Sequence, residues 1–161
     1  NPGLSWDHLT TVRHRTSLPI VLKGILHPDD ARKAIELGVD AIIVSNHGGR
    51  QVDNALASLD ALVTIREAVG PQLTILLDSG IRSGTDVLIG LALGANACLL
   101  GRPYIYGLAL DGEDGVRQVI ENIAAELDVT MGLIGVRTVQ DLSPDHLTPY
   151  RVDHLRGSAG V

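Results

Sequence analysis

Four short apolar runs, each followed by a segment with helical periodicity, constrain the fold of this chain more than any other feature. Each run has the usual length of a buried strand, and the runs lie at 20–23, 41–44, 73–77 and 97–100. Leu37–Val44 and Leu93–Leu100 share one pattern, in which a helix end and a glycine precede a strand. Repetition of one βα unit is typical of a parallel architecture, so we predict four parallel strands buried on both faces.

Start and stop residues frame the helices between these runs. Pro28 suits the first position of a helix, and Gly38 is expected to end that helix. Ser83 with Asp86 three residues later is a variant of the capping box and predicts another helix start. The last long helix is expected to begin at about Asp114, where an apolar stripe with helical spacing starts.

The number of units indicates part of a larger architecture. A complete (β/α)8 barrel needs about 250 residues and eight units, whereas this chain has 161 residues and four units. We predict an α/β fold in which residues 1–161 form about the last four βα units of a (β/α)8 TIM barrel, with an N-terminal half of the same barrel as partner. The segments are an entry segment, four units and a tail, at 1–18, 19–133 and 134–161. A small open doubly wound sheet is the alternative.

Composition excludes several classes of function. The net charge is −6 and no basic stripe is present, which argues against a nucleic-acid partner. The single cysteine, Cys98, excludes an internal disulfide and a cysteine-based zinc cluster, and we predict no metal site and a cytoplasmic location. No apolar run reaches the roughly 20 residues that a membrane span needs.

Each predicted strand ends in a polar or glycine-rich segment, and in a βα barrel such ends gather at one rim. The four segments are Lys23-Gly24, Ser45–Arg50, Asp78–Arg82 and Gly101–Pro103. The last two predict an anion site, because glycines allow backbone N–H groups to approach a phosphate and the arginines add charge.

The remaining two segments carry candidate chemistry. His47 is suited to proton transfer near neutral pH, and Arg50 can bind a carboxylate through two parallel hydrogen bonds. The alternative is a structural turn in which His47 caps a carbonyl and Arg50 pairs with Asp53. Lys23 ends an otherwise apolar strand and can stabilise negative charge on a cofactor, unless it only extends to solvent.

In their order and spacing, these segments resemble the FMN-dependent 2-hydroxy acid oxidoreductases, a family that includes glycolate oxidase, lactate oxidase, lactate 2-monooxygenase and mandelate dehydrogenase. The resemblance extends from about Leu4 to Leu142 and covers the C-terminal half of the family's FMN-binding TIM barrel. It implies FMN as cofactor, a small L-2-hydroxy acid as substrate, a 2-keto acid as product, and a homo-oligomer, in this family a tetramer.

The resemblance also implies roles for single residues. His47 is similar to the base that takes a proton from the substrate, and Arg50 to the residue that binds its carboxylate. Lys23 resembles the lysine beside flavin N1 and the C2 carbonyl, Ser45 a residue that hydrogen-bonds the flavin ring, and Asp78 the aspartate that contacts the ribityl chain. The other implied cofactor-binding residues are Ser79, Gly80, Ile81, Arg82, Gly101 and Arg102, with Gly80, Arg82, Gly101 and Arg102 as the phosphate cradle.

Ser79 departs from the commonest family pattern, which has glycine at this position, and in this it resembles the lactate oxidases. We therefore expect a lactate-like substrate. The family's substrate-binding tyrosines and the aspartate that orients the histidine belong to its N-terminal half. Two alternatives remain: a non-catalytic half-barrel, and a related flavin- or phosphate-binding barrel with different chemistry.

Overall fold

The computed structural model describes residues 3–148, which form an α/β fold with one parallel sheet. The elements are α1 (Trp6–Arg13), β1 (Val21–Ile25), α2 (Pro28–Glu36), β2 (Ala41–Val44), α3 (Ser58–Val69), β3 (Thr74–Leu77), α4 (Gly84–Ala92), β4 (Ala97–Cys98) and α5 (Arg102–Leu133), with 3-10 turns at His47–Gly49, Gly70–Gln72, Val139–Asp141 and Pro144–His146. The predicted tail lies partly outside the described residues. Its described part, 134–148, contains two of these 3-10 turns and no strand.

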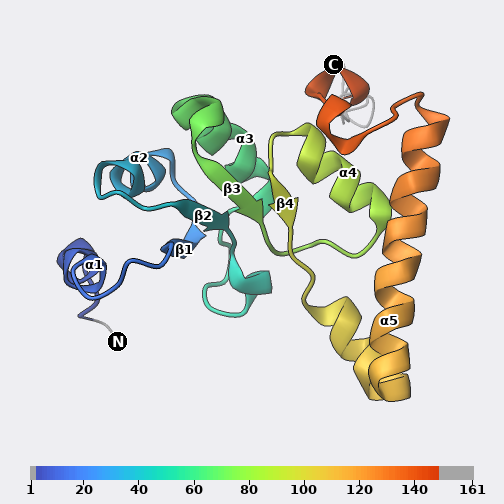
Figure 1. Cartoon of the computed structure of the whole chain (residues 1–161), viewed down its shortest axis with the longest axis horizontal. Helices are drawn as coiled ribbons and strands as arrows, with labels where there is room; N and C mark the ends of the chain where they lie inside the picture. The colour runs from blue at the N-terminus through green and yellow to red at the C-terminus, as the bar shows by residue number, and fades with distance from the viewer. Residues whose placement is uncertain (1–2, 149–161) are drawn as a thin grey trace, which may run out of the picture.

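The strands follow one another in the order β1-β2-β3-β4, and all neighbouring pairs are parallel. Their carboxyl ends therefore lie at one edge of the sheet, which is the lower edge in Figure 1. The loops that follow β2, β3 and β4 all leave from this edge (Figure 1). This is the arrangement of consecutive βα units in a barrel, as the sequence predicted.

The core lies between the sheet and the helices on one of its faces. Ile42 and Val44 of β2 and Ile75 and Leu77 of β3 are buried there, in one cluster with apolar side chains of α2 and α3. The opposite face is less covered, and Val21 of β1 is 44% exposed. The prediction that every strand is buried on both faces was thus wrong for β1 and β4, which are the two edge strands and have no further described strand beside them.

The helix boundaries largely follow the sequence signals. The capping box at the start of α4 is confirmed, since Ser83 Oγ accepts a hydrogen bond from Asp86 N at 3.1 Å and Asp86 Oδ2 accepts one from Ser83 N at 3.0 Å. The last helix differs from the prediction because α5 already begins at Arg102 and is interrupted at Asp111 and Gly112. The predicted helix start corresponds to the part of α5 that follows this break.

Arg66 of α3 connects the elements at the amino ends of β3 and β4. Its guanidinium donates to the carbonyl oxygens of Gly70 at 2.6 Å, Leu73 at 3.0 Å and Gly94 at 2.6 Å, and to Asn96 Oδ1 at 3.0 Å. Carbonyl groups at helix ends need such partners when they are partly buried. Arg66 therefore stabilises the end of the sheet opposite the polar loops.

Helices α4 and α5 pack at very short distance through Gly84. A Cβ atom at this position would overlap Leu127 N and lie 2.6 Å from Ile123 O, both backbone atoms of α5. The amide of Gly84 also donates a hydrogen bond to Glu126 Oε2 at 2.7 Å. Only glycine allows this approach, which fixes α5 against α4 and, through α5, the loop that follows β4. No helix within residues 3–148 is long and apolar enough to cross a membrane.

We expect Gly84→Ala to lower the free energy of unfolding by about 3 kcal/mol, because two backbones must separate to admit the methyl group. Gly132→Ala is the matched control, since a Cβ there meets no atom within 4 Å and alanine favours helix. Urea titrations of both variants and the parent measure the effect. Equal midpoints for Gly84→Ala and the parent would contradict the close packing.

Candidate active site

One pocket of about 350 Å³ lies at the carboxyl edge of the sheet and collects residues from all four strand ends. Every predicted site residue except Ser45 lines it: Lys23, His47, Arg50, Asp78, Ser79, Gly80, Ile81, Arg82, Gly101 and Arg102. The structure thus brings together residues that are up to 79 positions apart in the sequence, from Lys23 to Arg102. Their individual roles stay predictions.

A bulge in β1 positions Lys23. The pairing register with β2 shifts between Lys23 and Ile25, and Gly24 between them has a φ of +94°, which is a conformation that glycine adopts readily. The Lys23 ammonium group forms an ion pair with the Asp78 carboxylate and donates to Ser45 Oγ at 3.2 Å. Lys23 therefore has a charged partner at the pocket and does not simply extend to solvent.

Ser45 lies beneath the pocket rather than in its wall. It is 2% exposed, and its hydroxyl donates to Asp78 Oδ2 at 2.5 Å. The same oxygen accepts a hydrogen bond from His47 N at 3.1 Å. Ser45 thereby connects the Lys23–Asp78 ion pair to the turn that carries His47.

The Asp78 carboxylate is stabilised in its charged form. Burial is the largest single influence and acts to raise the pKa of Asp78, but hydrogen bonds from Lys23 and Ser45 and the charge of Lys23 together outweigh it. The net effect lowers the pKa of Asp78 below its ordinary value of 3.8. Asp78 is therefore an anion at neutral pH and holds the Lys23 ammonium group in place.

His47 and Arg50 both project from the 3-10 turn at the rim of the pocket. His47 has a φ of +57°, an uncommon conformation for a residue with a Cβ atom and one that is often found at functional sites. Both residues are exposed, and neither side chain forms a hydrogen bond or ion pair with another residue in 3–148. The alternative of a structural Arg50–Asp53 pair is therefore not formed.

The loops after β3 and β4 form an anion cradle. Gly80 has a φ of +84°, Gly101 precedes the first turn of α5, and open space lies next to the Cα atoms of both glycines. The side chain of Arg82 has no partner within the described residues, and Arg102 donates only to Gly48 O, at 3.3 Å. A helix start with two arginines and exposed glycine amides is suited to a phosphate.

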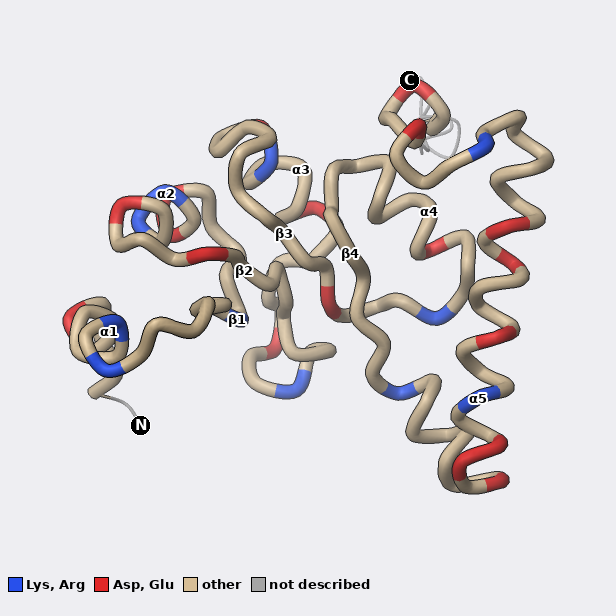
Figure 2. The backbone as a smooth tube through the Cα atoms, in the orientation of Figure 1, with Lys and Arg blue, Asp and Glu red and all other residues tan. Residues whose placement is uncertain are grey.

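The pocket is cationic although the chain is acidic. Its wall contains the cationic side chains of Lys23, Arg50, Arg82 and Arg102 and the single carboxylate of Asp78, whereas the whole chain has a net charge of −6. Figure 2 shows blue segments in the loops after β2, β3 and β4 and mainly red segments along α5. Such a pocket attracts an anionic ligand.

Five residues of the pocket wall were not predicted as site residues, although two of them lie within the predicted segments: Gly48, Leu99, Pro103, Tyr104 and Ile105. The last three belong to the first turn of α5, and Pro103 is a helix-start signal that could have identified them. No group of three or more His, Cys, Asp or Glu side chains that could hold a metal ion is found within residues 3–148.

The lowered pKa of Asp78 predicts a pH-dependent contribution to stability. The contribution is present above the unfolded-state pKa and is lost as the pH falls through 3.8 toward the folded-state value. We expect Asp78→Asn to lower the free energy of unfolding at pH 6, with a difference from the parent that narrows at pH 3. Asp128→Asn, an exposed site on α5, is the control. A difference for Asp78→Asn that is constant over this range would contradict the charged interaction.

Comparison with known proteins matches the chain to a family. Residues 1–149 match the FMN-dependent dehydrogenase family. The chain is 55% identical over 142 residues to an L-lactate oxidase of Lysinibacillus sphaericus, covering 88% of this chain and 37% of that protein. It is 52% identical over 140 residues to 2-hydroxyacid oxidase 1 of Mus musculus, covering 87% of this chain and 38% of that protein. The chain thus spans less than half the length of these relatives.

Solved structures agree in fold. A mandelate oxidase crystal structure superposes with a TM-score of 0.82 and 49% sequence identity, covering 85% of this chain and 42% of that chain. Because the family match extends over nearly the whole chain and the close relatives share half of its residues, the resemblance inferred from the four strand ends is confirmed. The chain belongs to the FMN-dependent dehydrogenase family.

Proposed function

We propose that this chain supplies the FMN phosphate site and two substrate-facing residues of an enzyme that oxidises a small L-2-hydroxy acid, with L-lactate as the favoured substrate. The observation that carries the proposal is the placement of His47 and Arg50, without partners among the described residues, at the rim of a cationic pocket that includes an anion cradle. The relatives named L-lactate oxidase and 2-hydroxyacid oxidase support the substrate class.

The residues of the pocket fit FMN. Its phosphate would be held by the amides of Gly80 and Gly101 and the guanidinium groups of Arg82 and Arg102, beside which the pocket is open. Ile81 is buried and fixes the loop between Gly80 and Arg82. The two-electron oxidation itself is the chemistry that FMN supplies when it is bound.

Lys23 would serve the flavin ring of the cofactor, and Asp78 its ribityl chain. The Lys23 ammonium group lines the pocket and would stabilise the negative charge of a reduced flavin. Asp78 can exchange its hydrogen bond with Lys23 for one from a ribityl hydroxyl group. Ser45, which is buried, supports both residues from below, and a direct contact of Ser45 with the flavin ring stays a prediction.

The substrate would bind between this pocket and the turn that follows β2. Arg50 would bind the carboxylate of the hydroxy acid through two parallel hydrogen bonds. His47 would accept the proton of the substrate hydroxyl group, which requires the neutral imidazole and a position within hydrogen-bond distance of that oxygen. Both side chains are exposed and available for this in the structure.

The site is proposed to be complete only together with the first half of the barrel. Further strands would pack at the outer edge of β1 and over the partly exposed face of the sheet that lies opposite α2 and α3. A homo-oligomer, a tetramer by family resemblance, and a cytoplasmic location are further parts of this proposal. A non-catalytic half-barrel and a flavin barrel with different chemistry are the alternatives.

The proposed function is tested with the full-length protein under anaerobic conditions. We expect a yellow preparation whose visible flavin absorbance is bleached by L-lactate and restored by an electron acceptor. A colourless protein would favour the non-catalytic half-barrel. A yellow protein that no 2-hydroxy acid bleaches would favour a related flavin barrel with different chemistry.

We expect His47→Gln to slow flavin reduction by L-lactate by a factor of roughly 10²–10⁴, the usual contribution of a general base. The flavin should remain bound, because the phosphate cradle lies on other loops. Stopped-flow measurement of the reduction rate, with the flavin content of the variant as control, checks both parts. A rate within about twofold of the parent would contradict the role of His47.

A further inference from the structure

Ser79 adopts a backbone conformation that is unfavourable for serine. Its φ is +83°, in the region that glycine adopts readily and residues with a Cβ atom rarely do. The following residue, Gly80, has nearly the same φ of +84°. A glycine at position 79 would therefore fit the backbone better, and an interaction of the serine side chain can offset this cost.

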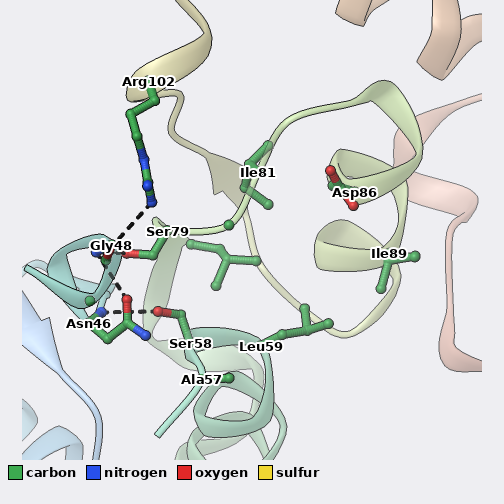
Figure 3. A pocket seen from close by; sticks show the side chains of 13 residues that line it. Asn46, Gly48, Ala57, Ser58, Leu59, Ser79, Ile81, Asp86, Ile89 and Arg102 are labelled. Atoms are coloured by element: carbon green, nitrogen blue, oxygen red, sulfur yellow. Dashed lines mark hydrogen bonds between the residues drawn. The ribbon is translucent and has the colours of Figure 1, made fainter. Parts of the chain in front are cut away.

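The Ser79 hydroxyl group points toward the turn that carries His47. It accepts a hydrogen bond from Gly48 N at 3.0 Å and lies 3.3 Å from Ser45 Oγ. Figure 3 shows the side chains of Ser79 and Asn46 on either side of Gly48. Asn46 Oδ1 accepts from the same amide at 3.0 Å, so the Gly48 N–H is shared between two acceptors.

Three strand ends meet at this turn. Ser45, at the end of β2, binds the amide of His47 at 3.1 Å. Ser79, at the end of β3, binds the amide of Gly48, and Arg102, after β4, donates to the Gly48 carbonyl oxygen at 3.3 Å. The loop that would contact FMN is thereby connected by a side chain directly to the turn from which His47 projects.

We propose that Ser79 is a positioning residue, whose hydroxyl group fixes the His47–Gly48 turn and so sets the direction of the His47 imidazole toward the substrate. The consequence for catalysis rests on the proposed function, whereas the hydrogen bond to Gly48 does not. Proton transfer is sensitive to the distance and angle between base and hydroxyl group, so loss of this bond lowers the rate without removing the base.

Two variants separate the hydroxyl group from the backbone conformation. Ser79→Gly removes the hydroxyl and relieves the unfavourable φ, while Ser79→Ala removes the hydroxyl and keeps the unfavourable φ. In the full-length holoenzyme, both are expected to slow flavin reduction by saturating L-lactate roughly tenfold, while KM changes less than about twofold because Arg50 is untouched. The midpoint of thermal unfolding is expected to be higher for Ser79→Gly than for Ser79→Ala, because glycine tolerates the positive φ.

Amide hydrogen exchange gives a measurement that does not depend on turnover. Exchange at Gly48, followed by mass spectrometry of a peptide that spans the turn, is expected to increase roughly fivefold in both variants. Asn46→Ala removes the other acceptor of the Gly48 amide. The increase in exchange at Gly48 in this variant shows how much the loss of one hydrogen bond contributes.

Each outcome bears on the proposal. If only Ser79→Ala slows flavin reduction, the effect comes from the backbone conformation and the proposal is overturned. Flavin reduction at the parent's rate in both variants would also overturn it. If L-lactate and other 2-hydroxy acids do not reduce the parent, the proposed function fails instead. Amide exchange at Gly48 then decides whether Ser79 holds the turn. An exchange rate in both Ser79 variants equal to that of the parent would overturn the role of Ser79 in holding the turn.

Discussion

The parallel register of the four strands is the constraint on which the rest of this structure depends. Lys23 pairs with Ile43, Ile43 with Leu76 and Leu76 with Ala97, so equivalent positions of all strands lie at one level of the sheet. Because all strands run in the same direction, the loops that follow them meet at one edge. Side chains that are distant in the sequence can then share a single pocket, which none of the loops could form alone.

Charge within that pocket is organised around one partly buried carboxylate. Asp78 holds the Lys23 ammonium group and receives the Ser45 hydroxyl, and its pKa is lowered because these interactions outweigh its burial. The remaining cationic side chains at the pocket have no carboxylate partner within residues 3–148 and are available to an anion. The site thus differs from a surface ion-pair network, in which each charge would already be neutralised by a neighbour.

The sequence predicted the strands, the order of the elements and the residues that converge, because each rests on local periodicity or on the geometry of parallel strands. It did not predict the early start of α5, because Asp111 and Gly112 interrupt the helix and its helical pattern, so that only the part after them was recognised. Nor did it predict that Ser79 faces the His47 turn, because the direction of a side chain depends on φ values that composition does not reveal. Burial of β1 and β4 was overestimated because apolar residues on an edge strand look like those of a central strand.

The bonds of Arg66 lie at the amino ends of β3 and β4, whereas the residues with candidate chemistry lie at the carboxyl ends. The bonds of Arg66 therefore support the sheet from positions that carry none of the candidate chemistry. Loops at the reactive edge can diversify in evolution toward new substrates while this guanidinium keeps the scaffold intact. A directed-evolution library confined to those loops would consequently retain a high proportion of folded members.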